Sequence, residues 1–186
     1  MQARANRSLQ SGQSLVEFAI ASIVLILLFG GLADLSRALH FQDVLHNAVR
    51  EGARHGAYFN PGYPGNQFLD DPDIKSVVDQ QMTSGGLPNT SLHTPGACPA
   101  PTDGNTAGNP PYPSTAFSNV TGQPYLYICY GAPLVAAALA TAPGPKGTAN
   151  GADLNVILTL PYGPLTGAIP GTNFRLAANW HVMVQQ

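Results

Sequence analysis

Residues 15–33, LVEFAIASIVLILLFGGLA, form a long apolar stretch whose only charged residue is Glu17, near its start. As an α-helix it extends about 28 Å, close to the ~30 Å thickness of the hydrocarbon core of a bilayer. A helix also satisfies its own backbone hydrogen bonds, as lipid requires. The stretch predicts a membrane span over about residues 15–33. A buried core helix is disfavoured, because the rest of the chain has too little apolar surface to enclose it.

The residues before the span indicate its orientation. Residues 1–12, MQARANRSLQSG, contain Arg4 and Arg7 and no acid. Because positive flanking charge is retained in the cytoplasm, we expect residues 1–12 to be a cytoplasmic leader and residues 58–186 to be a head outside. The apolar run lacks an Ala-x-Ala site after it, which disfavours a secretory signal cleaved there.

The helix is predicted to continue beyond the span through residues 34–57, DLSRALHFQDVLHNAVREGARHGA. Apolar residues recur there at three- and four-residue steps, the spacing of one helix face; they are Leu35, Ala38, Leu39, Leu45, Ala48, Val49 and Ala53. No proline interrupts the chain before Pro61. We therefore predict one helix over residues 13–57, about 67 Å long, with a membrane part and an amphipathic part.

The first half of the head is rich in turn-forming residues. The chain has 20 glycines and 17 prolines among 186 residues, well above average usage. One helix is predicted from Asp70 to Met82, because acids and Pro72 favour a helix start and Gly85-Gly86 ends the apolar periodicity. We expect loop from Gly86 to Pro124, with one short strand over residues 116–120.

Three segments near the C-terminus have the composition or alternation of strands. They are residues 125–130, 153–160 and 173–185, and the last two place apolar side chains at every second position. Turn-forming clusters separate the last two. The pattern predicts an antiparallel meander with one buried face, covered by the amphipathic half of the helix. The predicted fold class is α+β.

The two cysteines, Cys98 and Cys129, both lie in the part expected outside the cytoplasm, where disulfides persist. A bridge would close a loop of about thirty residues, worth roughly 3–4 kcal/mol in the chain-entropy model. It would attach the proline- and glycine-rich loop to a strand. The alternative is two unrelated thiols, one of them buried.

The segment around the start of the span resembles a known family. Gly12-Gln13-Ser14-Leu15-Val16-Glu17-Phe18 is similar to the processing site of type IV prepilins. With the ending Ala-x-Arg-Glu-Gly-Ala-Arg at residues 48–54, it resembles the TadE-like family, pilin-like or pseudopilin proteins of the tight-adherence, type IVc pilus system. The resemblance covers roughly residues 12–57.

The resemblance implies a function in assembly. A prepilin peptidase would cut after Gly12 and free Gln13, and a platform and ATPase would extract the subunit. Glu17, with Phe18 beside it, would pair with the new α-ammonium of a neighbouring pilin-like subunit, because a buried carboxylate is costly unless paired. Alternatively, Glu17 lies at headgroup depth. A freed Gln13 could also cyclise and lose its charge.

The implied location is the bacterial inner membrane, with one span, the N-terminus in the cytoplasm and the head outside, or an extracellular filament after assembly. Other functional classes find less support. Charged residues are only 10% of the chain and the net charge is −2, which argues against nucleic acid. We recognise no catalytic motif and no metal-ligand spacing among the five histidines, so we expect no enzyme, no metal and no cofactor. The alternative functions are a permanently anchored binding module and, least favoured, an anchored hydrolase.

Overall fold

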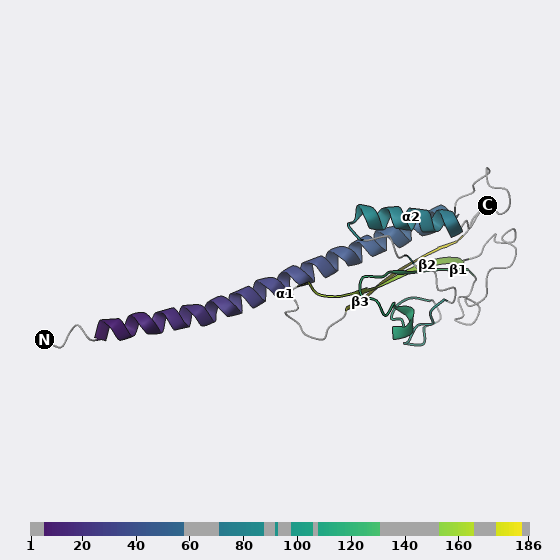
Figure 1. The fold of residues 1–186 in the computed structure, drawn as a ribbon. Helices are drawn as coiled ribbons and strands as arrows, with labels where there is room; N and C mark the ends of the chain where they lie inside the picture. Colours follow the sequence, from purple (N-terminus) through teal and green to yellow (C-terminus); the bar gives the residue numbers. More distant parts are fainter. Residues whose placement is uncertain are drawn as a thin grey trace. The chain divides into compact units, whose positions relative to one another are not determined.

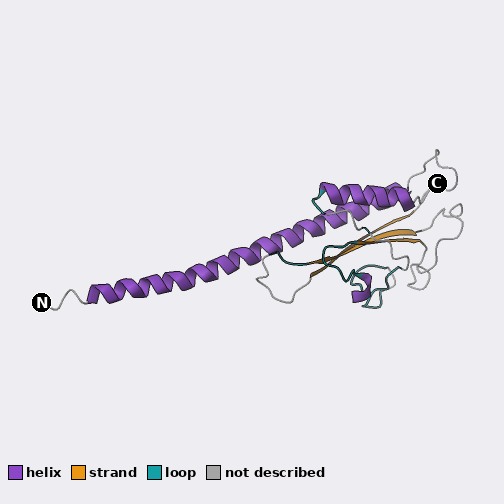
Figure 2. Ribbon diagram, viewed as in Figure 1, coloured by secondary structure: helices purple, strands orange, loops and turns teal. Residues whose placement is uncertain are grey.

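The structure is a computed structural model that describes residues 6–57, 71–87, 92, 98–105, 108–130, 153–165 and 174–183. It has an α+β fold, as predicted, with a long N-terminal helix and a small antiparallel sheet (Figures 1 and 2). The elements are α1 (Asn6–Ala57), α2 (Asp71–Ser84), the 3₁₀ helix η1 (Ser114–Ala116), β1 (Tyr125–Tyr130), β2 (Asp153–Tyr162) and β3 (Phe174–Met183).

The chain divides into two compact units, and the boundary falls inside α1. Residues 1–37 and 164–172 make up the first unit, and residues 38–163 and 173–186 the second. The first unit therefore contains the apolar half of α1. The second contains the amphipathic half together with α2 and all three strands.

The sheet of the second unit is the predicted antiparallel meander, in the order β1-β2-β3. Its register sets Leu126 opposite Leu158, and Leu158 opposite Ala178. These three side chains lie on one face and are buried. Composition in β1 and alternation in β2 and β3 thus correctly predicted the three strands, and the alternation in β2 correctly predicted its apolar buried face.

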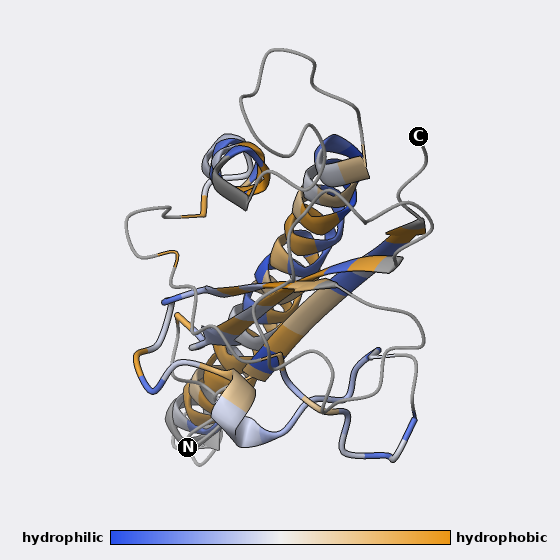
Figure 3. Cartoon of the chain, turned by 90° about the vertical axis from the view of Figure 1, so that its right-hand side faces the viewer, coloured by the Kyte–Doolittle hydropathy of each residue, from blue (hydrophilic) through white to orange (hydrophobic). Residues whose placement is uncertain are grey.

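The amphipathic half of α1 and the helix α2 cover that face. α1 contributes Leu45, Ala48, Val49 and Ala53, and α2 contributes Ile74, Val78 and Met82, all of them fully buried. Figure 3 shows apolar residues on the side of α2 that faces α1. α2 ends as predicted at Gly85-Gly86, where Gly86 adopts a φ of 78°, a conformation that glycine tolerates best.

The second face of the sheet is also buried, so the prediction of one buried face was wrong. Tyr112, Ala116 and Phe117, from the loop region before β1, pack on this face against Tyr127 and Ile157. The central strand β2 is buried on both sides as a result. Alternation in the sequence missed this, because β2 carries the small polar residues Asn155 and Thr159 on that face.

The loop region itself departs from one prediction. The strand expected over residues 116–120 is absent, and the chain forms η1 followed by turns. The Ala116 and Phe117 amides donate to the carbonyls of Pro113 and Ser114. Local hydrogen bonds of this kind replace the ladder that a strand would need.

Two details of α1 also differ from the prediction. The helix begins at Asn6 instead of Gln13, so it includes part of the predicted leader. Leu35 and Leu39, assigned to the buried face, are 53% and 60% exposed, whereas Phe41 and Val44 are buried. The buried face is therefore rotated slightly from the one that the sequence predicted.

Candidate functional site

The apolar half of α1 is the most conspicuous surface of the molecule. Among the described residues, α1 is the one helix long and apolar enough to cross a membrane, and none of its most apolar window is buried. Its exposed large side chains form a continuous series: Leu15, Val16, Phe18, Ile20, Ile23, Val24, Leu25, Ile26, Leu27, Leu28, Phe29 and Leu32. A surface this apolar requires lipid or another apolar partner.

The two residues flanking the predicted processing bond differ in their surroundings. Gly12 lies within α1, and a Cβ added there would meet nothing within 4 Å. The Gln13 side-chain amide nitrogen donates to the Glu17 carboxylate at 3.1 Å, one turn along the same helix. Gly12 is therefore not required for packing in the described structure.

Glu17 and Phe18 lie side by side in sequence at the start of the apolar surface. Phe18 is 74% exposed, and its carbonyl also accepts a hydrogen bond from the Ser22 hydroxyl at 2.8 Å. Glu17 is exposed as well. Both side chains are thus available to a partner outside this chain.

A polar contact that the sequence did not signal lies at the other end of the apolar surface. The Asp34 carboxylate accepts a hydrogen bond of 2.9 Å from the Leu165 amide, and Asp34 is only 3% exposed. Both residues belong to the first unit. The contact joins positions 131 residues apart, so no local sequence pattern could have indicated it.

Cys98 and Cys129 form a disulfide, with their Cα atoms 6.2 Å apart. Cys129 is on β1 and is 1% exposed, while Cys98 packs against the cluster of Tyr112, Phe117 and Tyr127. The bond spans 31 residues. It attaches the loop region to the sheet face that this region covers.

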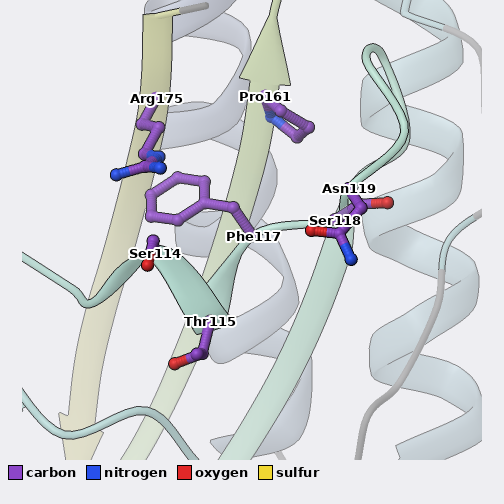
Figure 4. Close-up of a pocket in the computed structure, with 7 residues that line it drawn as sticks. All are labelled: Ser114, Thr115, Phe117, Ser118, Asn119, Pro161 and Arg175. Atoms are coloured by element: carbon purple, nitrogen blue, oxygen red, sulfur yellow. The ribbon is translucent and has the colours of Figure 1, made fainter.

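A pocket of about 360 Å³ opens beside that loop region (Figure 4). The Phe117 ring points toward Arg175, whose guanidinium carbon lies 5.8 Å from the ring centroid. The pocket is lined by Ser114, Thr115, Phe117, Ser118, Asn119, Pro161 and Arg175. Sequence reasoning missed this site, because its residues come from three separate segments and follow no motif.

The titratable side chains of the described ranges form no metal-binding cluster. No group of three or more His, Cys, Asp or Glu side chains there could hold a metal ion. His40 and His181 contact neutral oxygens, those of Gly85 and Asn109, while His55 lies 3.4 Å from the Asp73 carboxylate. His93 lies outside the described residues.

Comparison with known proteins adds one finding. The comparison with curated proteins and the comparison with solved structures each gave no match. The family model described as TadE-like protein matches residues 12–54. The matched range begins at Gly12, includes the exposed apolar surface and ends within the buried face of α1. The N-terminal segment of this chain is therefore similar to TadE-like proteins, as the sequence indicated.

Proposed function

We propose that this protein is a pilin-like subunit that takes part in assembling a tight-adherence, type IVc-like pilus or a related secretion filament, as a minor component. The observation that carries the proposal is the position of the TadE-like match. It covers the length of α1 over which the apolar side chains change from exposed to buried in the core of the head. One helix thus serves both as a membrane anchor and as the scaffold of the head.

In this proposal α1 spans the inner membrane once, with its N-terminus in the cytoplasm and the head outside. A prepilin peptidase cuts the bond between Gly12 and Gln13. Glycine in a helix interior costs about 1 kcal/mol relative to alanine, so Gly12 weakens the helix where the peptidase must open it. The open space around Gly12 supports access to this bond.

Cleavage converts the Gln13 peptide nitrogen into an α-ammonium group. The Glu17 carboxylate of a neighbouring subunit then pairs with it, because an ionised carboxylate at membrane depth is costly without a partner. The hydrogen bond from the Gln13 side chain occupies one Glu17 oxygen and leaves the other for this contact. The pairing fixes the axial register of one subunit against the next.

The apolar surface of α1 then passes from lipid to the apolar helices of other subunits. Extraction is carried out by the assembly platform and its ATPase. The function is assembly and not turnover, so activity resides in contacts between subunits.

The test compares two glycines of α1 in a bacterium with an active prepilin peptidase. Gly12 and Gly31 both face open space, so valine at either position meets no neighbour at Cβ. Mass spectrometry of the native protein is expected to find Gln13, free or cyclised, as the N-terminus. Gly12→Val should keep the leader and fail to enter filaments, whereas Gly31→Val should be processed normally.

A native N-terminus at Met1, or normal assembly of Gly12→Val, would contradict the proposal and favour a permanently anchored binding module. A second variant separates processing from assembly. Glu17→Gln should be cleaved but should not assemble, because a neutral amide cannot pair with an ammonium charge. Asp43→Asn removes an exposed acid elsewhere on α1. This control variant should be cleaved and should also assemble into filaments.

A further inference from the structure

The pocket between η1 and the β2–β3 end of the sheet has a lining that suits a ligand. We propose that it binds an acidic sugar unit, a uronic acid, of a polysaccharide. Its volume of about 360 Å³ is at the lower end of the range for small-molecule sites, roughly 300–1,000 Å³. That volume fits one monomer of a polymer and not a long segment. The proposal does not depend on processing at Gly12.

The electrostatics of the pocket select for a negative group. Arg175 is the one charged residue of the lining, and no acidic side chain lines the pocket among the residues that the structure describes. Arg175 is exposed, and it has no ion pair with any described residue. A planar guanidinium binds a carboxylate through two parallel hydrogen bonds.

The position of the guanidinium is restrained before any ligand arrives. Its carbon lies 5.8 Å from the centroid of Phe117, within the range of a cation–π interaction. Phe117 is itself only 6% exposed and is fixed in the cluster around Tyr127. Because Arg175 rests on a rigid ring, less side-chain entropy is lost on binding.

The neutral polar groups of the pocket match the hydroxyls of a sugar. Ser114, Thr115 and Asn119 are exposed, and their side chains make no hydrogen bond within the described part of the chain. Ser118 is different, because its hydroxyl already donates to Gln123 at 2.6 Å.

A peptide carboxylate is a poorer fit for this pocket. Capture of a chain terminus relies on free backbone amides. Here three backbone amides already donate hydrogen bonds within the loop. The Ala116 amide donates to the Pro113 carbonyl, and the Phe117 amide to the Ser114 carbonyl. The Val120 amide donates to the Ser118 hydroxyl. The side-chain donors of Ser114, Thr115, Asn119 and Arg175 are spread around the cavity, an arrangement that suits a polyhydroxylated ring.

The test uses the full chain in a detergent without a sugar headgroup, with immobilised oligogalacturonate as the probe. Neutral maltodextrin and poly-L-glutamate are the comparison probes. We expect saturable binding to oligogalacturonate alone. Arg175→Ala should weaken it at least tenfold, since a charge-assisted hydrogen bond is lost. Thr115→Val should weaken it by about two- to tenfold.

Arg50→Ala is the matched control. Arg50 is also exposed and also stacks on an aromatic ring, at 5.5 Å from Trp180, so the variant removes the same charge and the same type of contact. Its binding should equal that of the native chain. The proposal is overturned by absence of saturable binding to oligogalacturonate, by equal binding to poly-L-glutamate, or by an equal loss in Arg50→Ala.

Discussion

Gly52 of α1 lies so close to Val78 of α2 that a Cβ added at Gly52 would come 2.7 Å from a methyl group of Val78. Val78 is fully buried and β-branched, so it cannot rotate away. Gly56 and Gly85 have similarly close neighbours, Ile74 and Val44. Gly52, in the motif at residues 48–54, and the nearby Gly56 and Gly85 thus permit close packing of the two helices.

Gly52→Ala should destabilise the head by about 1–2 kcal/mol. Overpacking a core costs about 1–3 kcal/mol, and the better helix propensity of alanine returns up to about 1 kcal/mol. Trp180, the only tryptophan, lies on β3 and reports unfolding of the head by its fluorescence. Gly31→Ala, with open space around it, is the control. An unfolding midpoint of Gly52→Ala equal to that of the native protein would show that α2 shifts freely relative to α1.

Replacing both cysteines by serine should lower the stability of the head by roughly 3–4 kcal/mol, the chain-entropy estimate for a loop of this length. The loss should be largest where the bond acts, in the loop region that Cys98 attaches to β1. Hydrogen exchange is therefore expected to accelerate more in residues 98–124 than in residues 38–57. Native protein treated with a reductant should behave in the same way. Equal acceleration of hydrogen exchange in both segments would contradict a local role for the disulfide.

The Ala116 carbonyl accepts two hydrogen bonds from the sheet, at 3.0 Å from the Tyr127 hydroxyl and at 2.6 Å from the Thr159 hydroxyl. Burial raises the pKa of Tyr127 to about 12, which keeps its hydroxyl protonated as a donor. Tyr127→Phe or Thr159→Val alone leaves the carbonyl one partner. The double variant leaves a buried carbonyl unpaired, which costs about 1–3 kcal/mol.

We therefore expect the double variant to lose more stability than the sum of the two single variants, by about 1 kcal/mol or more. Chemical denaturation followed by Trp180 fluorescence measures the free energy of unfolding of the native protein, the two single variants and the double variant. Strict additivity would mean that water or another group reaches the Ala116 carbonyl when both hydroxyls are removed.

The sequence predicted those features of the fold that depend on periodicity. The long helix, α2 and the three strands follow from apolar spacing and turn residues near each end. The failures that concern the buried face of the sheet have one physical cause, since burial by distant segments leaves no local pattern. Asn155 and Thr159 are fully buried because the loop region covers them. Trp180, which shares the alternation of β3, is 43% exposed beneath Arg50.

The candidate sites also fall into those that a local sequence pattern indicates and those that only the fold brings together. Gly12, Gln13 and Glu17 are contiguous, so a local motif identified them. The pocket at Arg175 combines side chains from the loop region, β2 and β3. Serine, threonine and arginine at such positions are ordinary surface residues until the fold brings them around one cavity.

Asp79 on α2 offers a prediction that depends on pH. One of its carboxylate oxygens is buried and has no hydrogen-bond partner in the described structure. Burial raises the pKa of Asp79 above its ordinary value, and the charge of Lys75, one turn away, lowers it to a lesser extent. Ionised Asp79 therefore destabilises the folded head. The folded protein binds the Asp79 proton more tightly than the unfolded chain does. The loss of folding stability is therefore present above the pKa of Asp79 in the folded state, and it disappears as the carboxyl is protonated at lower pH.

Asp79→Asn should accordingly raise the unfolding midpoint at about pH 7, and the gain should vanish at about pH 3, where native Asp79 is neutral. Thermal unfolding at both pH values, followed by Trp180 fluorescence, measures the difference. Asp43→Asn, at an exposed position of α1, controls for the change in net charge. A lower midpoint for Asp79→Asn at neutral pH would mean that the attraction of Lys75 outweighs the cost of burial.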